Sequence, residues 1–266
     1  MRKRWLFVVF SVLLIAASGC SATSGTAKSG QKTVIVGTGT QFPNICFLDH
    51  KGHLTGYDVE VVRAIDKKLP QYNFKFKTME FSNLLTSLSA KKIDMVAHNM
   101  AKNAEREKQF TFNKIPYNYS PMYITVLENN QSIHSLKDLY GKKVIVGATS
   151  NAADYITQYN KEHGNPIKLV YAGQGSNDPA HQLSTGRADA TVAAPFAVKF
   201  QNETSSIKEK TVGKVLLDTK VYFIFGKGNT KLSRAVDKAI KELEKDGTLK
   251  KLSKKWLGGD YSKSSF

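Results

Sequence analysis

The chain has 266 residues, of which 41% are hydrophobic and 23% charged, and its formal net charge is +17 at pH 7. This surplus of cations is compatible with nucleic-acid binding, but the lysines are scattered, without a dense arginine block or stacking aromatics beside them. Attraction to an anionic surface such as a cell envelope explains the charge more simply. We therefore expect no nucleic-acid partner.

The N-terminus has the pattern of a secretory signal. Three cations precede an apolar run from Trp5 to about Ala17, which is too short and wrongly flanked for an ordinary membrane span. The end of this run, Ala-Ser-Gly-Cys at 17–20, resembles the lipobox of bacterial lipoproteins, although Ala17 replaces the commoner leucine. The resemblance implies a signal peptide at 1–19 and lipid attachment at Cys20. Removal of three cations from +17 would leave +14, and Cys46 would be the only remaining thiol, so no internal disulfide is expected.

Residues 20–31 are small and polar without apolar periodicity, as in a flexible tether. The remainder, about 235 residues, is too long for one comfortable core and suits two small α/β domains. We therefore expect a mature protein outside the cytoplasm, held at the membrane by its lipid.

The first half of this remainder alternates strand and helix. A buried strand at 34–40 runs into a Gly/Thr loop, and a helix follows with Asp58 as the predicted N-cap and Val62, Ile65 and Leu69 on one face. A strand at 74–78 and a short leucine-rich helix after Phe81 continue the pattern. Such alternation predicts a mainly parallel sheet covered on both faces.

Long extended segments at 116–130 and 215–225 frame a second alternating unit. Its first strand repeats the letters VIVG of 34–37 at 144–147, and each copy leads into a Gly/Thr loop. Helices are predicted from Ala152 to about His163, up to Gly186, and from Pro195. The end of the chain has apolar residues at i, i+3, i+4 spacing from Leu232 to Leu243, followed by a stripe of Leu249, Leu252 and Trp256, which predicts packing helices.

The stretch from Ile93 to Asn113 is the main candidate for a ligand site. Ile93 to Ala97 reads as a buried strand, 98–103 as a loop at the carboxyl edge of the sheet, and Arg106 as part of the first turn of a helix. A guanidinium there can grip a carboxylate with two parallel donors. An arginine by itself is more often a solvated surface residue, so this role depends on the rest of the chain.

Several phrases in order resemble the amino-acid-binding family of solute-binding proteins of ABC transporters. They are LTGYDVEVVRAI, NAEREKQFTF, SLKDLYGKKVIVGATS, GRADAT and EKDGTLKKLSKKWLG, and the resemblance covers Lys32 to Gly259. It implies the α/β, periplasmic-binding-protein-like type II fold, with two α/β lobes joined by two hinge strands. Lobe 1 would comprise 32–121 plus 221–266, and lobe 2 would comprise 122–220. The implied partners are an amino acid and the permease subunits of an ABC importer, with no cofactor and a monomeric state.

The resemblance also implies site residues. Arg106 falls on the arginine that grips the ligand α-carboxylate, and Asn99 and Ala101 fall on loop positions whose backbone binds the α-groups. Ala101 replaces a common Ser or Thr. Ser150, flanked by Thr149 and Asn151, matches a second carboxylate-binding position. Phe42 matches a stacking aromatic, and Phe81 lies at another cleft-facing position, although without the resemblance both would be read as core aromatics.

Departures from the family pattern bear on the ligand. Gly39 stands where relatives that bind basic amino acids have an aspartate, which argues against lysine, arginine or histidine. Ala194 stands where many relatives have the aspartate that pairs with the α-amine, and a buried ammonium without a partner is costly. Asp178, which is equally plausible as a helix cap, is the candidate replacement, with Glu80 behind it.

The phrases FPNICF, ATSNAA, GQGSND and ATVAAPFAV are closest to the cystine-binding branch, in which the polar loop from Gln174 to Asp178 could serve the second end of L-cystine. Glutamate, glutamine or another sulfur amino acid stay open as ligands. A dehydratase-type enzyme on the same fold is the competing class, but no acid or base for it is identifiable, and we expect no enzyme. His50 and His53 near Asp49 are too few to predict a metal site, and none is expected.

Overall fold

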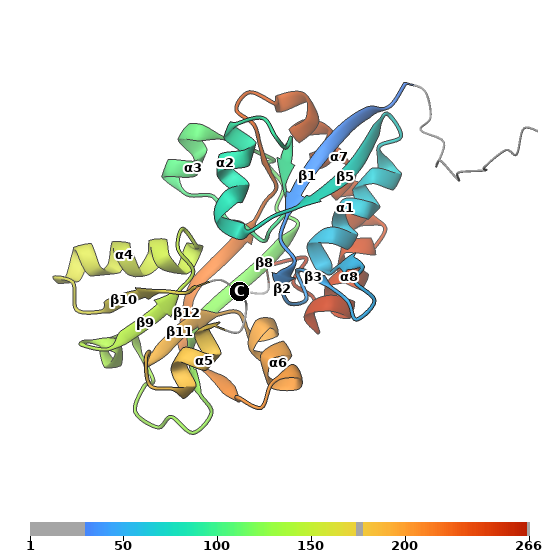
Figure 1. Cartoon of the computed structure of the whole chain (residues 1–266). Coiled ribbons are helices and arrows are strands. Elements are labelled where there is room, and N and C mark those ends of the chain that lie inside the picture. The colour runs from blue at the N-terminus through green and yellow to red at the C-terminus, as the bar shows by residue number, and fades with distance from the viewer. Residues whose placement is uncertain (1–29, 174–177, 265–266) are drawn as a thin grey trace, which may run out of the picture. The chain divides into compact units, whose positions relative to one another are not determined.

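The computed structural model describes residues 30–173 and 178–264. Cys20, the signal peptide and nearly all of the predicted tether therefore lie outside the described residues, as does Gln174. The described chain forms two five-stranded sheets and one small antiparallel sheet (Figure 1). The first large sheet has the order β5 (Tyr72–Thr78), β1 (Lys32–Thr38), β6 (Met95–Val96), β13 (Ile224–Phe225) and β7 (Thr111–Phe112).

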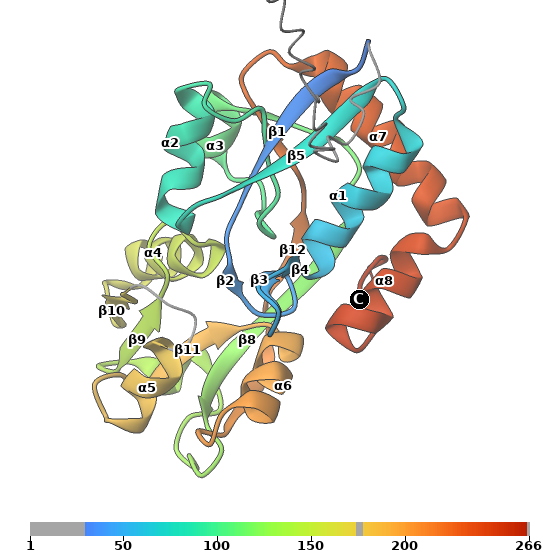
Figure 2. The same cartoon turned by 45° about the vertical axis from the view of Figure 1, so that its right-hand side comes forward.

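Helices cover both faces of the first sheet. The buried side chains of α1 (Tyr57–Lys68), α7 (Thr230–Lys245) and α8 (Thr248–Leu257) share one apolar cluster with Val34 and Val36 of β1. The opposite face carries α2 (Leu84–Ser89), preceded by a 3₁₀ turn at Phe81–Asn83, and the short α3 (Ala104–Gln109) (Figure 2). The amphipathic spacing of the C-terminal helices thus predicted their packing role correctly.

The second large sheet repeats this arrangement. Its order is β10 (Lys168–Tyr171), β9 (Lys143–Val146), β11 (Ala190–Ala193), β8 (Asn118–Leu127) and β12 (Glu209–Val221). The strands carrying the two VIVG copies, β1 and β9, each pair in parallel with two neighbours. One face carries α4 (Asn151–His163), and the other carries α5 (Asp178–Ser184) and α6 (Pro195–Thr204) (Figure 1). A 3₁₀ turn at Leu136–Leu139 precedes β9.

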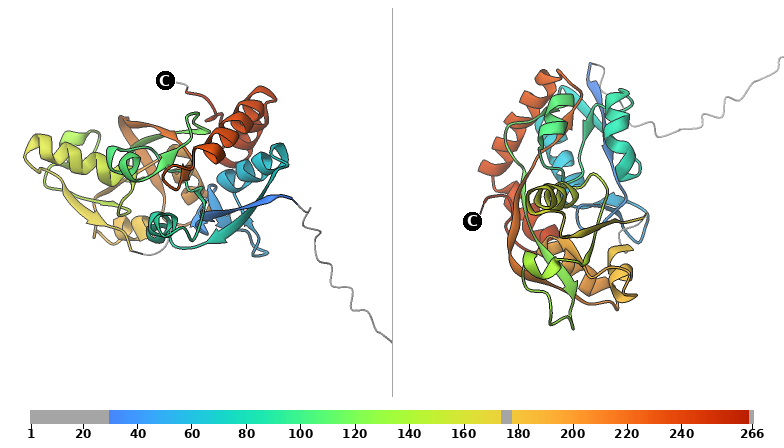
Figure 3. Two further views of the ribbon diagram at one scale, coloured as in Figure 1. Left: turned by 90° about the horizontal axis from the view of Figure 1, so that it is seen from above. Right: turned by 90° about the vertical axis from the view of Figure 1, so that its left-hand side faces the viewer.

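Two long strands connect the sheets. β8 and β12 pair in antiparallel fashion from Asn118 opposite Val221 to Leu127 opposite Glu209, and they run side by side in Figure 3. At the Val221 end the backbone also forms an isolated bridge to Ala101, before β13 enters the first sheet. The described chain is therefore two α/β lobes joined by two hinge strands.

Three local features differ from the prediction. Both large sheets are mixed, because the chain returns through the antiparallel strands β13, β8 and β12. A small sheet of β2 (Gln41–Phe42), β3 (Cys46–Leu48) and β4 (Leu54–Thr55) was not predicted, because its strands have only two or three residues. The assignment of Asp58 as a helix N-cap is wrong, because α1 starts at Tyr57 after Gly56, and Asp58 is buried in the first turn.

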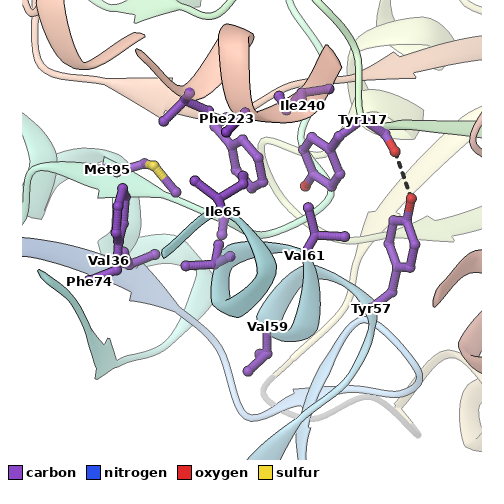
Figure 4. Close-up of a cluster of buried hydrophobic side chains, with 14 of the residues drawn as sticks. Val36, Tyr57, Val59, Val61, Ile65, Phe74, Met95, Tyr117, Phe223 and Ile240 are labelled. Carbon is purple, nitrogen blue, oxygen red and sulfur yellow. Dashed lines mark hydrogen bonds between the residues drawn. The ribbon is translucent and has the colours of Figure 1, made fainter. Parts of the chain in front are cut away.

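The core of the first lobe holds the start of the hinge in place. The Tyr57 hydroxyl donates a 2.6 Å hydrogen bond to the backbone oxygen of Tyr117, just before β8 (Figure 4). The Tyr117 ring stacks on Phe223 with 4.0 Å between ring centroids. Cys46 is fully buried beside this core, and burial raises the pKa of its thiol to about 12, so it behaves as a small apolar side chain.

Candidate functional site

A cavity of about 490 Å³ lies between the two lobes. One wall consists of the loop after β1, the segment before α2 and the loop after β6, all at the carboxyl ends of first-lobe strands. The other wall consists of the loop between β9 and α4 and the ends of β11, α5 and α6. This is the edge at which open α/β sheets bind ligands.

Two phenylalanines and a histidine form an aromatic group in the first-lobe wall. The His98 ring centroid lies 5.6 Å from that of Phe42 and 4.9 Å from that of Phe81, and all three residues line the cavity. Both phenylalanines are only partly buried. They therefore present ring surface to the cavity, as expected for residues that contact a ligand.

His98 occupies the space beside Gly39. A Cβ atom placed on Gly39 would lie 2.7 Å from His98 Nε2, so the loop after β1 approaches the imidazole as closely as a glycine allows. Burial lowers the pKa of His98 to about 4, which leaves the ring neutral near pH 7. An acidic side chain at position 39 would meet this ring.

Asn99 is fixed by its backbone and its side chain. Its φ of 47° is left-handed, and its backbone nitrogen donates a 2.6 Å hydrogen bond to Asp58 Oδ2. Its Oδ1 accepts a 2.9 Å bond from Asn118 Nδ2 at the start of β8. Burial raises the pKa of Asp58 to about 7, opposed by the hydrogen bonds from Asn99 and Tyr117. The loop at 98–103, here called the cavity loop, is thereby connected by hydrogen bonds to both α1 and the hinge.

Arg106 bridges the lobes at the edge of the cavity. It is 5% exposed, in the first turn of α3, where its backbone nitrogen donates to the N-cap side chain of Asn103 at 2.8 Å. Its guanidinium donates to the backbone oxygen of Ala101 at 2.8 Å, to Asn151 Oδ1 at 3.0 Å, and to the backbone oxygen of Thr149. Burial lowers the pKa of Arg106, opposed by Asp154 and Glu105, and the group stays charged near pH 7.

The second-lobe partners of Arg106 belong to one turn. Thr149 has a φ of 59°, and Ser150 is the N-cap of α4, accepting a 3.1 Å hydrogen bond from the Ala153 nitrogen through its side chain. A further hydrogen bond joins Asn103 Nδ2 to Asp154 Oδ2. The N-terminus of α4 therefore faces α3 directly and carries the contacts that hold the lobes together here.

The predicted site residues fall into two neighbouring groups. Phe42, Phe81, Asn99 and Ser150 line the cavity, whereas Ala101, Arg106, Thr149 and Asn151 form the bridge beside it. Glu80 also lines the cavity, and Ala194 lies in its wall as the N-cap of α6. Asp178 is the first residue of α5, but its side chain lies outside the described part, so its predicted role is untested.

Three residues that line the cavity were not selected from the sequence as site residues. They are His98, Gln201 and Glu209. Among the described lining residues of the cavity, Glu80 and Glu209 are the only carboxyl side chains, and none is a lysine or arginine. The cavity is thus suited to a ligand with an ammonium group. The guanidinium of Arg106 lies beside the cavity, in the bridge between the lobes.

Within the described ranges, no group of three or more His, Cys, Asp or Glu side chains is placed to hold a metal ion. In the same ranges, no helix is both long enough and apolar enough to cross a membrane.

Comparison with known proteins identifies the class. The model of the bacterial extracellular solute-binding proteins, family 3, matches residues 34–259, and the chain belongs to this family. The match confirms the expected binding protein, rather than an enzyme, and the expected two-lobe fold.

The most informative relatives share both sequence and structure. The L-cystine-binding protein TcyJ of Bacillus subtilis (strain 168) is 67% identical over 265 residues, covering 100% of this chain and 98% of that protein. TcyK of the same organism, also an L-cystine-binding protein, is 56% identical, covering 100% of this chain and 99% of that protein. A solved structure of a putative L-cystine ABC transporter from Listeria monocytogenes has a TM-score of 0.82 and 63% identity, covering 87% of this chain and 98% of that one.

Proposed function

We propose that this protein captures L-cystine outside the cytoplasm and delivers it to an ABC importer. The observation that carries the proposal is the 67% identity, over the full chain, to an L-cystine-binding protein. The cavity supports it independently, because the polarizable disulfide of cystine suits contact with the Phe42, Phe81 and His98 rings. Ligands that carry charge of one sign only fit less well, because the cavity wall has carboxyl groups and the guanidinium of Arg106 supplies the opposite charge at the lobe interface.

In this proposal one amino-acid end of the ligand binds between the lobes. The Arg106 guanidinium grips the α-carboxylate, assisted by Ser150, Thr149 and Asn151, and the backbone groups of Asn99 and Ala101 bind the α-groups. Phe42 and Phe81 pack on the ligand body. Glu80 in the cavity wall and Asp178 are the candidates for the α-amine, since Ala194 has no carboxylate to offer.

Closure follows from the same contacts. A ligand that touches both walls binds the closed form more tightly than the open form, and it therefore shifts the population toward closure about the two hinge strands. The bridge from Arg106 to Thr149 and Asn151 adds to this preference. The permease subunits of the importer would then recognise the closed protein.

The anchoring and the boundaries are part of the proposal. We place a signal peptide at residues 1–19, lipid attachment at Cys20 and a tether at 20–31, so that a monomer is held on the outer face of the membrane. Lobe 1 comprises 32–121 plus 221–266, and lobe 2 comprises 122–220. The positions of the two hinge strands support these boundaries.

A thermal-shift screen of residues 31–266, the compact unit of the chain, tests the ligand. L-Cystine at about 100 times its dissociation constant should add about 2.7 kcal/mol to the free energy of unfolding. Glutamate, glutamine and S-methyl-L-cysteine serve as the competing ligands. A strong shift with one of these and none with cystine would refute the cystine assignment while leaving the family membership intact.

A further inference from the structure

The cavity extends from the cleft to the face of the second sheet that α5 and α6 cover. Glu209, the first residue of β12, and Gln201, in the second half of α6, line this inner part. The lining of the second lobe includes several small side chains, among them Ala180, Ala194 and Ala197. Space is therefore left beside two polar side chains at the inner end of the cavity.

Both side chains hold an unsatisfied polar atom. Glu209 is 6% exposed, and its Oε1 is buried without a hydrogen-bond partner among the described residues. Gln201 Nε2 is likewise buried and unpartnered there. A buried polar group without a partner costs about 1–3 kcal/mol, and more when it is charged, so the two on the second-lobe side of the cavity need an explanation.

Two other polar side chains of the second lobe have hydrogen-bond partners. The Thr191 hydroxyl, also in the cavity wall, donates a 2.7 Å hydrogen bond to the backbone oxygen of Ile145. Lys208, one of the two lysines that flank Glu209 in sequence, donates to the backbone oxygens of Asn202 and Ser205. No cation of the described residues forms an ion pair with Glu209.

The backbone of Glu209 is held in place. Its nitrogen donates a 2.8 Å hydrogen bond to Asn202 Oδ1, and its oxygen accepts a 2.8 Å bond from Asn202 Nδ2. Opposite Glu209 in the ladder lies Leu127 at the end of β8. The strand start is thereby anchored to α6, the helix that also carries Gln201, and the acid and the amide keep a fixed relation.

We propose that Glu209 and Gln201 form a subsite for the second amino-acid end of a two-ended ligand. Glu209 Oε1 accepts a hydrogen bond from the far ammonium, and Gln201 Nε2 donates one to the far carboxylate. The subsite rests on the proposed function, because L-cystine is such a ligand. It provides the acceptor and the donor that a zwitterionic end requires, in the second-lobe wall of the cavity, whereas Phe81 and His98 belong to the first-lobe wall.

The electrostatics agree with this geometry. Burial raises the pKa of Glu209 to about 7, so the carboxylate is poorly solvated in the empty protein. An ammonium brought to Oε1 supplies the missing opposite charge, and this compensation contributes to binding. A ligand with only one amino-acid end would leave the subsite unused.

Calorimetric titration of the wild type and Glu209→Gln with L-cystine and with S-methyl-L-cysteine tests the proposal. The variant should bind cystine about 10- to 100-fold more weakly, as expected for a lost charge-assisted hydrogen bond, and bind the one-ended ligand within about twofold of the wild type. If S-methyl-L-cysteine does not bind the wild type measurably, this result supports the need for a second amino-acid end in the ligand. The weaker binding of cystine to Glu209→Gln then shows that this second end binds at Glu209.

Glu203→Gln is the matched control, because Glu203 is an exposed carboxylate of α6, 3.8 Å from Lys199 Nζ. It should leave both affinities unchanged. Gln201→Leu, which removes the side-chain amide and leaves the carboxylate of Glu209 in place, should weaken cystine selectively as well. The melting temperature of ligand-free Glu209→Gln should equal or exceed that of the wild type, because the variant removes a buried, unpaired carboxylate.

Equal cystine affinity of Glu209→Gln and the wild type would overturn the subsite and leave the proposed function standing. Equal loss for both ligands would overturn it as well, because the residue would then act on the whole site. A wild type that does not bind cystine at all would refute the proposed function, and the subsite with it.

Discussion

The Asp58 carboxylate accepts a 2.6 Å hydrogen bond from the backbone nitrogen of Asn99, across 41 residues of sequence. The same oxygen, Oδ2, accepts a 2.8 Å bond from the Tyr117 hydroxyl. One fully buried acid thus connects α1, the cavity loop and the residue that precedes the first hinge strand. Its role is to position Asn99, whose left-handed backbone presents the loop to the cavity.

Asp58→Ala should therefore lower both stability and ligand affinity. The substitution leaves the Asn99 N–H and the Tyr117 hydroxyl buried without an acceptor, which should reduce the free energy of unfolding by about 2–5 kcal/mol. Asp58→Asn is the matched control, because its side-chain oxygen can still accept both bonds. Urea unfolding and calorimetric titration with cystine measure the two effects. A loss for Ala no greater than that for Asn would contradict the positioning role.

The same carboxyl group predicts a pH dependence of stability. The pKa of Asp58 is raised from 3.8 to about 7 by burial, so the folded protein retains its proton at pH values where the unfolded chain has lost it. Rising pH between about 4 and 7 then favours the unfolded state, by at most about 1.4 kcal/mol per pH unit. This contribution is constant below and above that window.

Urea unfolding of the wild type and Asp58→Asn from pH 4 to pH 8 isolates this group from all others that titrate. The stability of the wild type relative to the variant should fall as the pH rises to about 7 and then level off. A difference that is independent of pH would show that Asp58 titrates alike in the folded and unfolded chains.

The order of elements could be read from the sequence, but long-range contacts could not. The periodicity from Leu232 to Leu243 predicted α7, and the two VIVG copies fell on corresponding strands. Asp58 was misassigned because an aspartate before an apolar helical pattern has the sequence signature of an N-cap. Its actual partners, Asn99 and Tyr117, are distant in sequence and could not be predicted from it.

The inner end of the site was missed for a related reason. Glu209 stands between Lys208 and Lys210, where a glutamate reads as one more exposed charge. Only the pairing of β12 with β8 and the cover of α6 turn it toward the cavity. In contrast, Phe42, Phe81, Asn99 and Ser150 were selected through family resemblance, and all four line the cavity.

Gly39→Ala should disturb the aromatic group of the cavity. Its Cβ would approach His98 Nε2 to 2.7 Å, so the imidazole must shift between Phe42 and Phe81. We expect a loss of stability of about 1–3 kcal/mol and weaker cystine binding. Thermal unfolding and calorimetry measure both.

His98→Ala in the same background supplies the control. It removes the atom that the new methyl group meets, so the double variant should be less destabilised than the sum of the two single variants. Strict additivity would mean that Gly39 and His98 do not compete for this space.

Arg106→Ala should weaken cystine binding by at least about 100-fold, since it removes the proposed charged partner of the ligand carboxylate and the bridge to the second lobe together. Arg106→Lys should recover only part of the loss, because an ammonium cannot reach two acceptors with the fork geometry of a guanidinium. Arg234→Ala is the matched control, because this arginine is exposed on α7 and hydrogen-bonded within its helix to Thr230. Its loss should leave cystine affinity unchanged.

Small-angle X-ray scattering with and without cystine should show compaction for the wild type and Arg234→Ala, but not for Arg106→Ala at the same ligand concentration. Full affinity in Arg106→Ala would remove this residue from the site, and full affinity without compaction would restrict it to the bridge.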